Sequence, residues 1–313
     1  VDVNNNPLNP IINTRSFSED ADIVSEFSKK YAKGLQDYGM IATAKHFPGH
    51  GDTQTDSHSS LAMIPSDSSR LWSLELKPFA TMADSGVDVV MVAHVHAPDY
   101  QPEADDPATL SPFWVTDVLK DRLGFDGAII TDGMGMGGIT KNYSDDYAIV
   151  KAVQAGCHII IQNYDMVGSI DAIEKAVLHG QISEQQIDYS ALKMLELKYK
   201  VGLNLNPYIG LDHMMKNIST KRNREASNRI ASEAITLVKD SKGLLPINAS
   251  PKDTLYIIDI YDQEYKHSRS TVAAKIISER IPVRAIQIDE SDKKPILDVI
   301  VKSIPKNSQI LIN

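Results

Sequence analysis

The sequence is poor in cysteine and in basic clusters, and it has no apolar run long enough to span a bilayer. Its single cysteine is Cys157, so an internal disulfide is excluded. A transmembrane helix needs about 20 consecutive apolar residues, and no such stretch occurs. The net charge of -9, without a basic block, argues against nucleic acid or an anionic membrane as a partner. These absences leave the compartment open, because cytoplasmic, periplasmic and secreted locations all fit.

The composition is that of a globular protein with a sizeable core. Of the 313 residues, 42% are apolar and 23% are charged, which suits one large or two ordinary domains. Cys157 lies in the apolar segment 156–161, so we expect an inert, buried thiol. The chain starts with Val1, and both of its ends fall in strand-like segments. We therefore expect it to be a fragment at both ends.

The first two thirds of the chain repeat one order of elements: an apolar strand, a polar loop and an amphipathic helix. We expect strands at 1–3, 40–44, 87–93, 128–131 and 157–161. We expect helices at 19–38 with Ser18 as N-cap, from 66 or 67 onward with a kink at Pro78, and at 113–123, 145–155, 167–179 and 183–199. In the first helix, Ile23, Phe27, Tyr31 and Leu35 have the spacing of a face that turns to the core.

This alternation predicts an α/β fold built from parallel βαβ units. Five strands are visible and a closed (β/α)8 TIM-type barrel needs eight, so a barrel requires further strands before Val1. An open doubly wound sheet is the structural alternative. We assign 1–203 to a partial catalytic barrel, 204–222 to a linker and 223–313 to a partial second α/β domain. In that domain we expect strands at 255–260, 283–288 and 309–312, and helices near 220–234, 271–279 and 294–301.

Titratable residues concentrate in the segment 44–58, which follows a predicted strand and holds three histidines, two aspartates and a lysine. The carboxyl edge of parallel strands is where ligands bind in α/β proteins. Asp56 and His58 are two residues apart, so in extended chain they point the same way, and the carboxylate can orient the imidazole for general acid/base catalysis. A solvated loop and a metal site are the alternatives. The possible metal ligands are His46, His50, Asp52, Asp56 and His58.

Asp132 stands at the end of the predicted strand 128–131 and precedes a run of glycines, a position that suggests catalysis in a barrel. The glycines would let a ligand approach the backbone closely. A turn aspartate that caps a local N–H is the structural alternative. Met134 is a candidate for lining a substrate pocket, and flexible core filling is equally compatible with it.

Other polar residues at strand ends are candidate ligand donors. Arg15, Lys45 and His46 suit sugar hydroxyls or an amide carbonyl, with surface ion pairs as the alternative. His94 and His96 fit either a pocket or a structural role, and Asp52 can cap its loop. We expect structural roles for the isolated histidines His158, His179 and His213.

Several of these motifs together resemble a known family. The segment 45–51, with sequence KHFPGHG, followed by Asp56-Ser57-His58, is similar to the signature of family 3 glycoside hydrolases, and more narrowly to their β-N-acetylglucosaminidase branch of the NagZ type. Matching residues occur in the same order at Asp2, 15–17, 93–95, 125–127 and 131–136. Residues 226–246 resemble the start of that family's second domain, an α/β sandwich.

The resemblance implies a retaining, two-step mechanism. It implies that Asp132 is the nucleophile that forms a glycosyl-enzyme intermediate, and that His58, assisted by Asp56, is the acid/base on a mobile loop. It implies that Arg15, Lys45 and His46 hold N-acetylglucosamine. The family's N-terminal barrel strands, which supply another sugar-binding aspartate, are absent from this chain.

The function that the resemblance implies is hydrolysis of terminal, non-reducing β-N-acetylglucosamine, with peptidoglycan or chitin-fragment turnover as its expected setting and with no metal or cofactor. The alternatives are a phosphorylase or β-glucosidase of the same family, a metal-dependent hydrolase and a non-catalytic sugar-binding protein. Related β-glucosidases use a glutamate from the second domain, so the Asp-Ser-His element favours the aminosugar branch.

Overall fold

The computed structural model describes most of the chain, and it divides into two compact units, Val1–Met214 and Met215–Asn313. The described residues are 1–65, 68–101, 106–161, 165–208, 210–243, 245–247, 254–261, 277–279, 281–289, 302–305 and 309–312. The division lies within the segment 204–222 that we expect to be a linker. Helix α8 (Leu211–Asn217) occupies part of that segment, so it is not extended throughout.

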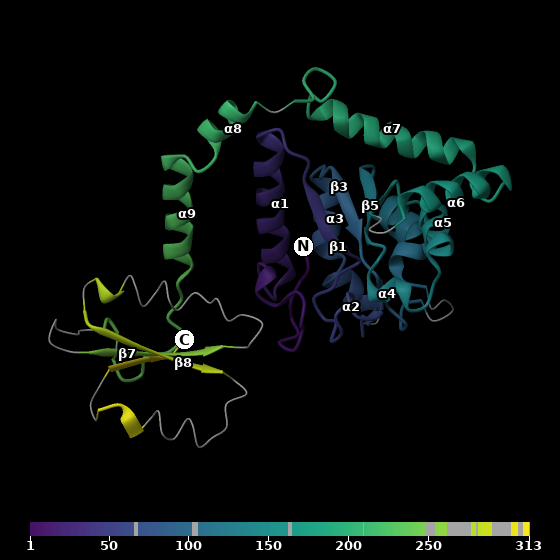
Figure 1. The fold of residues 1–313 in the computed structure, drawn as a ribbon. Helices are drawn as coiled ribbons and strands as arrows, with labels where there is room; N and C mark the ends of the chain where they lie inside the picture. The colour runs from purple at the N-terminus through teal and green to yellow at the C-terminus, as the bar shows by residue number, and fades with distance from the viewer. Residues whose placement is uncertain are drawn as a thin grey trace. The chain divides into compact units, whose positions relative to one another are not determined.

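A parallel sheet forms the centre of the first unit (Figure 1). Its strands follow the order β1-β3-β5-β6, so the strands of this sheet lie side by side in the order in which they occur in the chain. Their bounds are β1 Thr43–Phe47, β3 Val89–Val92, β5 Ala128–Gly133 and β6 Ile159–Ile161. Two short parallel strands, β2 (Ala62–Met63) and β4 (Val95–His96), form a separate pair. The expected α/β class with parallel βαβ units is present.

Helices connect the strands. Their bounds are α1 Ala21–Asp37, α2 Ser68–Ser73, α3 Lys77–Asp84, the π-helix η3 Phe113–Arg122, α4 Gly137–Thr140, α5 Asp145–Ala155, α6 Met166–Leu178 and α7 Glu184–Lys200. Two short 3-10 helices are η1 (Asn13–Arg15) and η2 (Ala108–Leu110). Helix α1 lies beside α3, and α5 lies beside α6 (Figure 1).

Three expected strand positions are wrong. Strand β1 starts at Thr43 and continues to Phe47, so Lys45 and His46 belong to the strand and not to the loop after it. Strand β5 likewise extends through Asp132 to Gly133. Residues 1–3 form no strand. The reason is that pairing decides strand ends: Phe47 pairs with Val92 and is fully buried, a long-range contact that local polarity does not reveal.

Of the four apolar residues expected on the inner face of α1, Leu35 packs against the core and the other three are exposed. Ile23, Phe27 and Tyr31 are 45%, 54% and 64% exposed, and Phe27 and Tyr31 contact the ring of Phe17. The buried residues of this helix are mostly small: Ala21, Val24, Ser25, Ser28 and Ala32. Small side chains permit close packing of α1 against α3. The N-cap is Asp20 and not Ser18.

Pro78 starts a helix instead of kinking one. The expected long helix is divided into α2 and α3, and Pro78 occupies the first turn of α3, where its missing N–H has no intrahelical partner to lose. The expected caps Ser66 and Asp67 lie outside the described residues. The core beneath these helices includes Phe47, Phe79 and Trp114, whose rings meet edge to face at centroid distances of 5.3 and 6.1 Å.

The second unit has its own parallel sheet, in the order β8-β7-β9. Its strands are β7 Leu255–Tyr261, β8 Val283–Asp289 and β9 Gln309–Ile312, close to the expected ranges. Helix α9 (Lys221–Ala234) is capped by Thr220. The expected helices near 271–279 and 294–301 lie almost wholly outside the described residues. Among the helices that the structure describes, none is both long and apolar enough to cross a bilayer.

Candidate active site

The candidate residues gather at the carboxyl ends of β1, β3 and β5. His46 lies within β1, His94 follows β3, and Asp132 lies near the end of β5. Because these strands are parallel and adjacent, their carboxyl ends share one edge of the sheet. The sheet thus brings together residues that are 86 positions apart in the sequence, from 46 to 132.

Asp2 organises the start of this edge. Its Oδ2 lies 2.8 Å from Nδ1 of His46, and its Oδ1 accepts the backbone N–H groups of His46 (3.2 Å) and His50 (2.7 Å). Burial by itself raises the pKa of Asp2, but the charge of His46 and the hydrogen bond from His46 hold it well below its usual value. The ionised carboxylate therefore fixes both histidines. The sequence indicated Asp2 only through the family resemblance.

A pocket of about 200 Å³ lies beside this cluster. Its lining includes Arg15, Lys45 and His46, the three residues we expect to hold a sugar, together with Asp2 and Phe17. Arg15 ends the short helix η1, and its guanidinium donates to the carbonyl of Ile11 at 3.2 Å, which leaves further donors for a ligand. The structure thus places these cationic and imidazole donors around one cavity of sugar-ring size.

Asp56 and His58 form the expected pair. Nδ1 of His58 lies 2.7 Å from Oδ1 of Asp56, and the same oxygen accepts the backbone N–H of His58 at 2.8 Å. The side chains are 36% and 63% exposed, respectively. With Nδ1 on the carboxylate, the proton on this nitrogen is held, and Nε2 is the nitrogen left to exchange a proton with a ligand.

The loop that carries His58 rests on the glycine turn after Asp132. The N–H of Gly137 donates to the carbonyl of His58 at 2.9 Å, and that of Gly138 to the carbonyl of Ser57 at 3.1 Å. A Cβ on Gly137 would lie 2.5 Å from the carbonyl oxygen of Ser59. These two glycines therefore admit the close approach of the chain's own loop, and the approach of a ligand to this turn stays a prediction.

Asp132 is half-buried, and its Oδ1 accepts the N–H of Gly133 at 2.8 Å. Next to it, buried His94 bonds Thr109 Oγ1 through Nδ1 and the carbonyl of Gly133 through Nε2, each at 2.9 Å. Burial lowers the pKa of His94 although the Gly133 carbonyl and the Asp132 charge oppose the shift. His94 thus supports the backbone of the turn at Asp132. For His94 this is the structural role, and not the pocket role, of the two that its sequence position allows.

Other candidates have structural surroundings. Met134 is 3% exposed and packs with Leu110 and Ile139, which favours core filling, and its contact with a substrate stays a prediction. Asp52 forms an ion pair with Arg70 at 2.6 Å. Cys157 is buried, and burial raises its pKa to about 12, in agreement with an inert thiol.

The five possible metal ligands do not converge. Asp52 faces Arg70, Asp56 faces His58, and both ring nitrogens of His50 bond hydroxyl groups. Among the described residues, no three His, Cys, Asp or Glu side chains come close enough together to hold a metal ion. The arrangement favours proton transfer between carboxylate and imidazole groups over metal binding.

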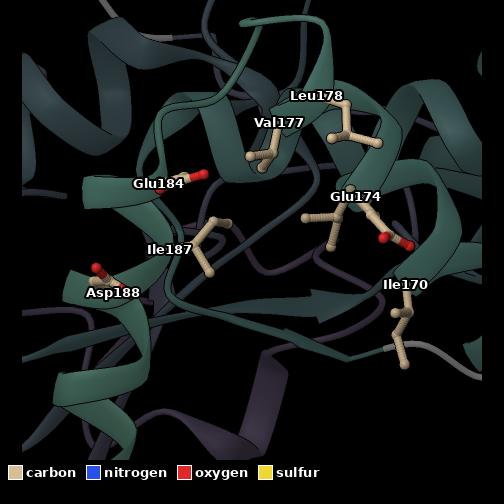
Figure 2. A pocket seen from close by; sticks show the side chains of 8 residues that line it. Ile170, Glu174, Val177, Leu178, Glu184, Ile187 and Asp188 are labelled. Atoms are coloured by element: carbon tan, nitrogen blue, oxygen red, sulfur yellow. The ribbon is translucent and has the colours of Figure 1, made fainter.

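A larger cavity of about 420 Å³ lies elsewhere, between α6 and α7 (Figure 2). Its lining includes Ile170, Val177 and Leu178 from α6, Ile187 from α7, and the acidic residues Glu174, Glu184 and Asp188. It has an apolar lining that contains none of the candidate residues of the site. We therefore assign the candidate site to the carboxyl edge of the sheet.

Comparison with known proteins identifies the family of the chain. The family model for the glycosyl hydrolase family 3 N terminal domain matches residues 1–197. The chain belongs to glycoside hydrolase family 3. The N-terminal domain of this family has a TIM-barrel-like α/β fold, which confirms the expected fold class. The four-stranded sheet of the first unit is then an arc of such a barrel, and the site lies at the carboxyl edge where barrel enzymes carry their catalytic residues.

Similar proteins of this family have related names. A "Beta-N-acetylglucosaminidase/beta-glucosidase" of Cellulomonas fimi is 29% identical over 83% of this chain and 48% of its own length. "Beta-hexosaminidase A" of Pseudoalteromonas piscicida is 30% identical over 79% of this chain and 44% of its own length. The solved structure of a family 3 β-N-acetylglucosaminidase from Paenibacillus sp. str. FPU-7 has a TM-score of 0.87 at 32% identity, covering 99% of this chain and 60% of that one. The chain thus spans about half the length of these curated relatives.

Proposed function

We propose that the protein is a retaining glycoside hydrolase that releases terminal, non-reducing β-linked N-acetylglucosamine. The observation that carries the proposal is the Asp56–His58 pair, held by its loop against the turn that follows Asp132. A carboxylate and a proton donor at one sheet edge are the two groups that a retaining glycosidase needs. The names of the relatives, which include hexosaminidase and N-acetylglucosaminidase, support the aminosugar as substrate.

In the first step, the Asp132 carboxylate attacks the anomeric carbon and forms a glycosyl ester as the bond to the leaving oxygen breaks. Protonated His58 gives its Nε2 proton to that oxygen, so the aglycone leaves as a neutral alcohol. Asp56 holds Nδ1–H and stabilises the imidazolium before the transfer. After it, His58 is a neutral imidazole and Asp132 is an uncharged ester.

In the second step, a water molecule attacks the anomeric carbon. Neutral His58 takes the proton of this water, the bond to Asp132 breaks, and the carboxylate is restored. Inversion occurs twice, so the sugar keeps its β configuration. The unperturbed pKa of a histidine, about 6.5, suits a group that must donate and then accept a proton near neutral pH.

The pocket beside Asp2 supplies the sugar contacts in this proposal. Arg15 and Lys45 donate hydrogen bonds to hydroxyl groups or to the carbonyl of the N-acetyl group, and His46 is oriented by Asp2 for the same purpose. Fragments of peptidoglycan or chitin carry such a terminal sugar, and we propose them as the natural source of substrate.

A phosphorylase is the second candidate function. The specific observation is that the acid/base is an imidazole and 63% exposed, so an incoming phosphate meets no negatively charged catalytic base. Phosphate would then attack the glycosyl-enzyme instead of water, and the product would be the sugar 1-phosphate. The two functions share the first step and differ only in the acceptor.

The test measures release of the aglycone from aryl β-N-acetylglucosaminide by the full-length protein, with the aryl β-glucoside as control. We expect turnover of the aminosugar, unchanged by a chelator, with free N-acetylglucosamine as product. A sugar 1-phosphate in added phosphate would support the phosphorylase, and preference for the glucoside would contradict the aminosugar assignment. Binding of N-acetylglucosamine without turnover would indicate a sugar-binding protein, and loss of turnover with chelator a metal-dependent hydrolase.

A further inference from the structure

His50 is a buried imidazole that takes no part in the proposed reaction. It is 1% exposed, and both of its ring nitrogens bond hydroxyl groups of its own loop. Nδ1 lies 2.5 Å from Oγ1 of Thr53, and Nε2 lies 2.9 Å from Oγ of Ser57. A buried histidine whose two ring nitrogens are both hydrogen-bonded has a fixed orientation, so it also fixes the positions of the two residues that it bonds.

The hydroxyl groups determine which nitrogen carries the proton. The Thr53 hydroxyl donates to the carbonyl of His50 at 3.0 Å, and it has one hydrogen only. Its oxygen therefore accepts from Nδ1–H of His50. Burial lowers the pKa of His50 in spite of the opposing charge of Asp2, in keeping with a neutral ring. Nε2 of a neutral ring with the proton on Nδ1 is an acceptor, and the Ser57 hydroxyl donates to it.

Ser57 connects this ring to the catalytic loop. It is the residue before His58 and is itself buried, and its carbonyl accepts the N–H of Gly138 at 3.1 Å. His50 is held in turn through its backbone N–H by Oδ1 of Asp2. A continuous set of hydrogen bonds therefore runs from Asp2 through His50 and Ser57 to the glycine turn that follows Asp132.

The Asp56–His58 pair cannot fix its own position. Both members lie on the same exposed loop, and the bond between them orients the ring only relative to that loop. In the part of the chain that the structure describes, His50 to Ser57 is the one side-chain hydrogen bond between residues 56–60 and the residues outside this segment. The other ties are the two backbone bonds from Gly137 and Gly138.

We propose that His50 is a positioning residue, which acts through Ser57 to hold the loop of His58 against the glycine turn so that the acid/base faces Asp132. This proposal rests on the proposed function for its effect on catalysis, and on the hydrogen bonds alone for its effect on the loop. The His50–Ser57 contact sets where the proton donor is and does not itself touch substrate.

The test uses the full-length protein with His50→Leu, His50→Gln and Ser57→Ala. Leucine and glutamine are similar in size, but only the glutamine amide oxygen can accept the Ser57 hydroxyl. His179→Gln and Ser190→Ala serve as matched controls, because these exposed or partly buried residues lie at the end of α6 and on α7. Two aryl β-N-acetylglucosaminides are compared, one with a good nitrophenol leaving group and one with a poor phenol leaving group.

A misplaced proton donor harms the substrate that needs protonation most. For Ser57→Ala and His50→Leu we expect kcat/KM to fall about 10- to 100-fold on the poor leaving group and less than about threefold on the good one. His50→Gln is expected to recover most of the loss. Azide, which attacks the glycosyl-enzyme without a general base, is expected to restore kcat on the good leaving group by forming the glycosyl azide and releasing Asp132. Equal losses on both substrates without azide rescue would overturn the positioning role.

Amide hydrogen exchange gives a second measurement that needs no turnover. We expect Ser57→Ala and His50→Leu to speed exchange in 52–60 and 134–140 about tenfold or more, with the remaining core and the control variants unchanged. Unchanged exchange at these segments would overturn the contact's role even in an active enzyme. Faster exchange in a protein that turns over neither glycoside would support the role in holding the loop and contradict the proposed function, so the two failures are distinguishable.

Discussion

The candidate catalytic residues at the carboxyl end of the parallel sheet and the aspartates at its amino end have opposite surroundings. At the amino end, Asp88 before β3 and Asp126 before β5 bind Lys200 and Lys193 of α7. Asp88 is buried and also accepts the N–H of Ala42 at 3.0 Å. At the carboxyl end, Asp132 is half-buried and has no cationic side chain bonded to it among the described residues, and His58 is largely exposed. The candidate catalytic residues Asp132 and His58 thus face outward, whereas the two aspartates of the amino end, like Asp2 at the carboxyl end, are paired within the fold.

This difference indicates that the paired aspartates at the amino end stabilise the fold, while the outward-facing groups at the carboxyl end are available for chemistry. A buried carboxylate that is bonded to a lysine and a backbone N–H cannot change its protonation cheaply, so it holds a helix to the strands. A carboxylate whose second oxygen is free can bond an incoming atom. The comparison predicts that variants at the carboxyl end change rate and that variants at the amino end change stability.

Asp132→Asn is expected to give the largest effect. The amide is nearly isosteric but is a poor nucleophile, so kcat on the aryl β-N-acetylglucosaminide should fall roughly 10³-fold or more with the fold intact. Steady-state kinetics and the thermal midpoint measure the two quantities. Asp146→Asn, an exposed residue in the first turn of α5, is the control. Retention of more than about a tenth of the wild-type rate by Asp132→Asn would remove Asp132 from the nucleophile role.

Gly137→Ala is expected to lower kcat about 10- to 100-fold, because a shift of about 1 Å in a catalytic group can cost this much. The new Cβ would meet backbone oxygens of Ser59 and His58 at 2.5 and 2.8 Å, and the loop must move. Gly34→Ala is the matched control, since a Cβ there meets nothing within 4 Å. Gly34 lies in the last turn of α1, where alanine should stabilise by at most about 0.5–1 kcal/mol and leave the rate unchanged. Equal kinetics for both variants would contradict the role given to the glycine turn.

Asp88→Ala tests the amino end. It leaves the N–H of Ala42 and the ammonium of Lys200 without their carboxylate, so the free energy of unfolding should fall by about 2–4 kcal/mol while kcat of the folded enzyme is unchanged. Urea unfolding and kinetics measure both. Asp37→Ala breaks an exposed pair with Lys33 and should barely change the unfolding midpoint. A loss of rate without a loss of stability for Asp88→Ala would reverse the comparison.

The smallest expected effect is at His158, whose contribution to the free energy of unfolding should depend on pH. Its Nδ1 accepts the N–H of Ile129 at 3.0 Å. Burial lowers the pKa of His158 to about 4, and the charges of Lys120 and Lys193 act in the same direction. In the unfolded chain His158 is protonated near pH 6.5, and in the folded chain only near pH 4. Its contribution to the free energy of unfolding is therefore complete above pH 6.5 and is lost as the pH falls toward 4. We expect this loss to be about 1–2 kcal/mol after allowance for the partial exposure of the ring.

In His158→Asn the amide oxygen can still accept the N–H of Ile129, and the titrating group is gone. We therefore expect the difference in unfolding free energy between wild type and variant to change between pH 6.5 and 4 and to be flat above pH 6.5. A constant difference over the whole range would show that the proton equilibrium of His158 is not linked to folding.

The sequence predicted the α/β class, the order of the elements and the Asp56–His58 pair. These depend on local features: strand and helix periodicity, and a spacing of two residues. Helices α5 and α9 begin and end within a residue of their expected positions, because Ser144 and Thr220 precede them and Gly156 ends the first. The predicted residues Arg15, Lys45 and His46 line one pocket, although their sugar contacts stay predictions.

Tertiary structure alone decided the rest. The inner face of α1 follows from packing against α3, the ends of β1 and β5 from pairing with neighbouring strands, and the role of Gly137 from a loop about 80 residues earlier in the chain. The bond from His50 to Ser57 was equally hidden, because in sequence His50 looked like a possible metal ligand. The sequence by itself determined which chemical groups are present and their local spacing. Only the fold decided which of them are buried and paired and which face a ligand, because burial depends on contacts between distant segments.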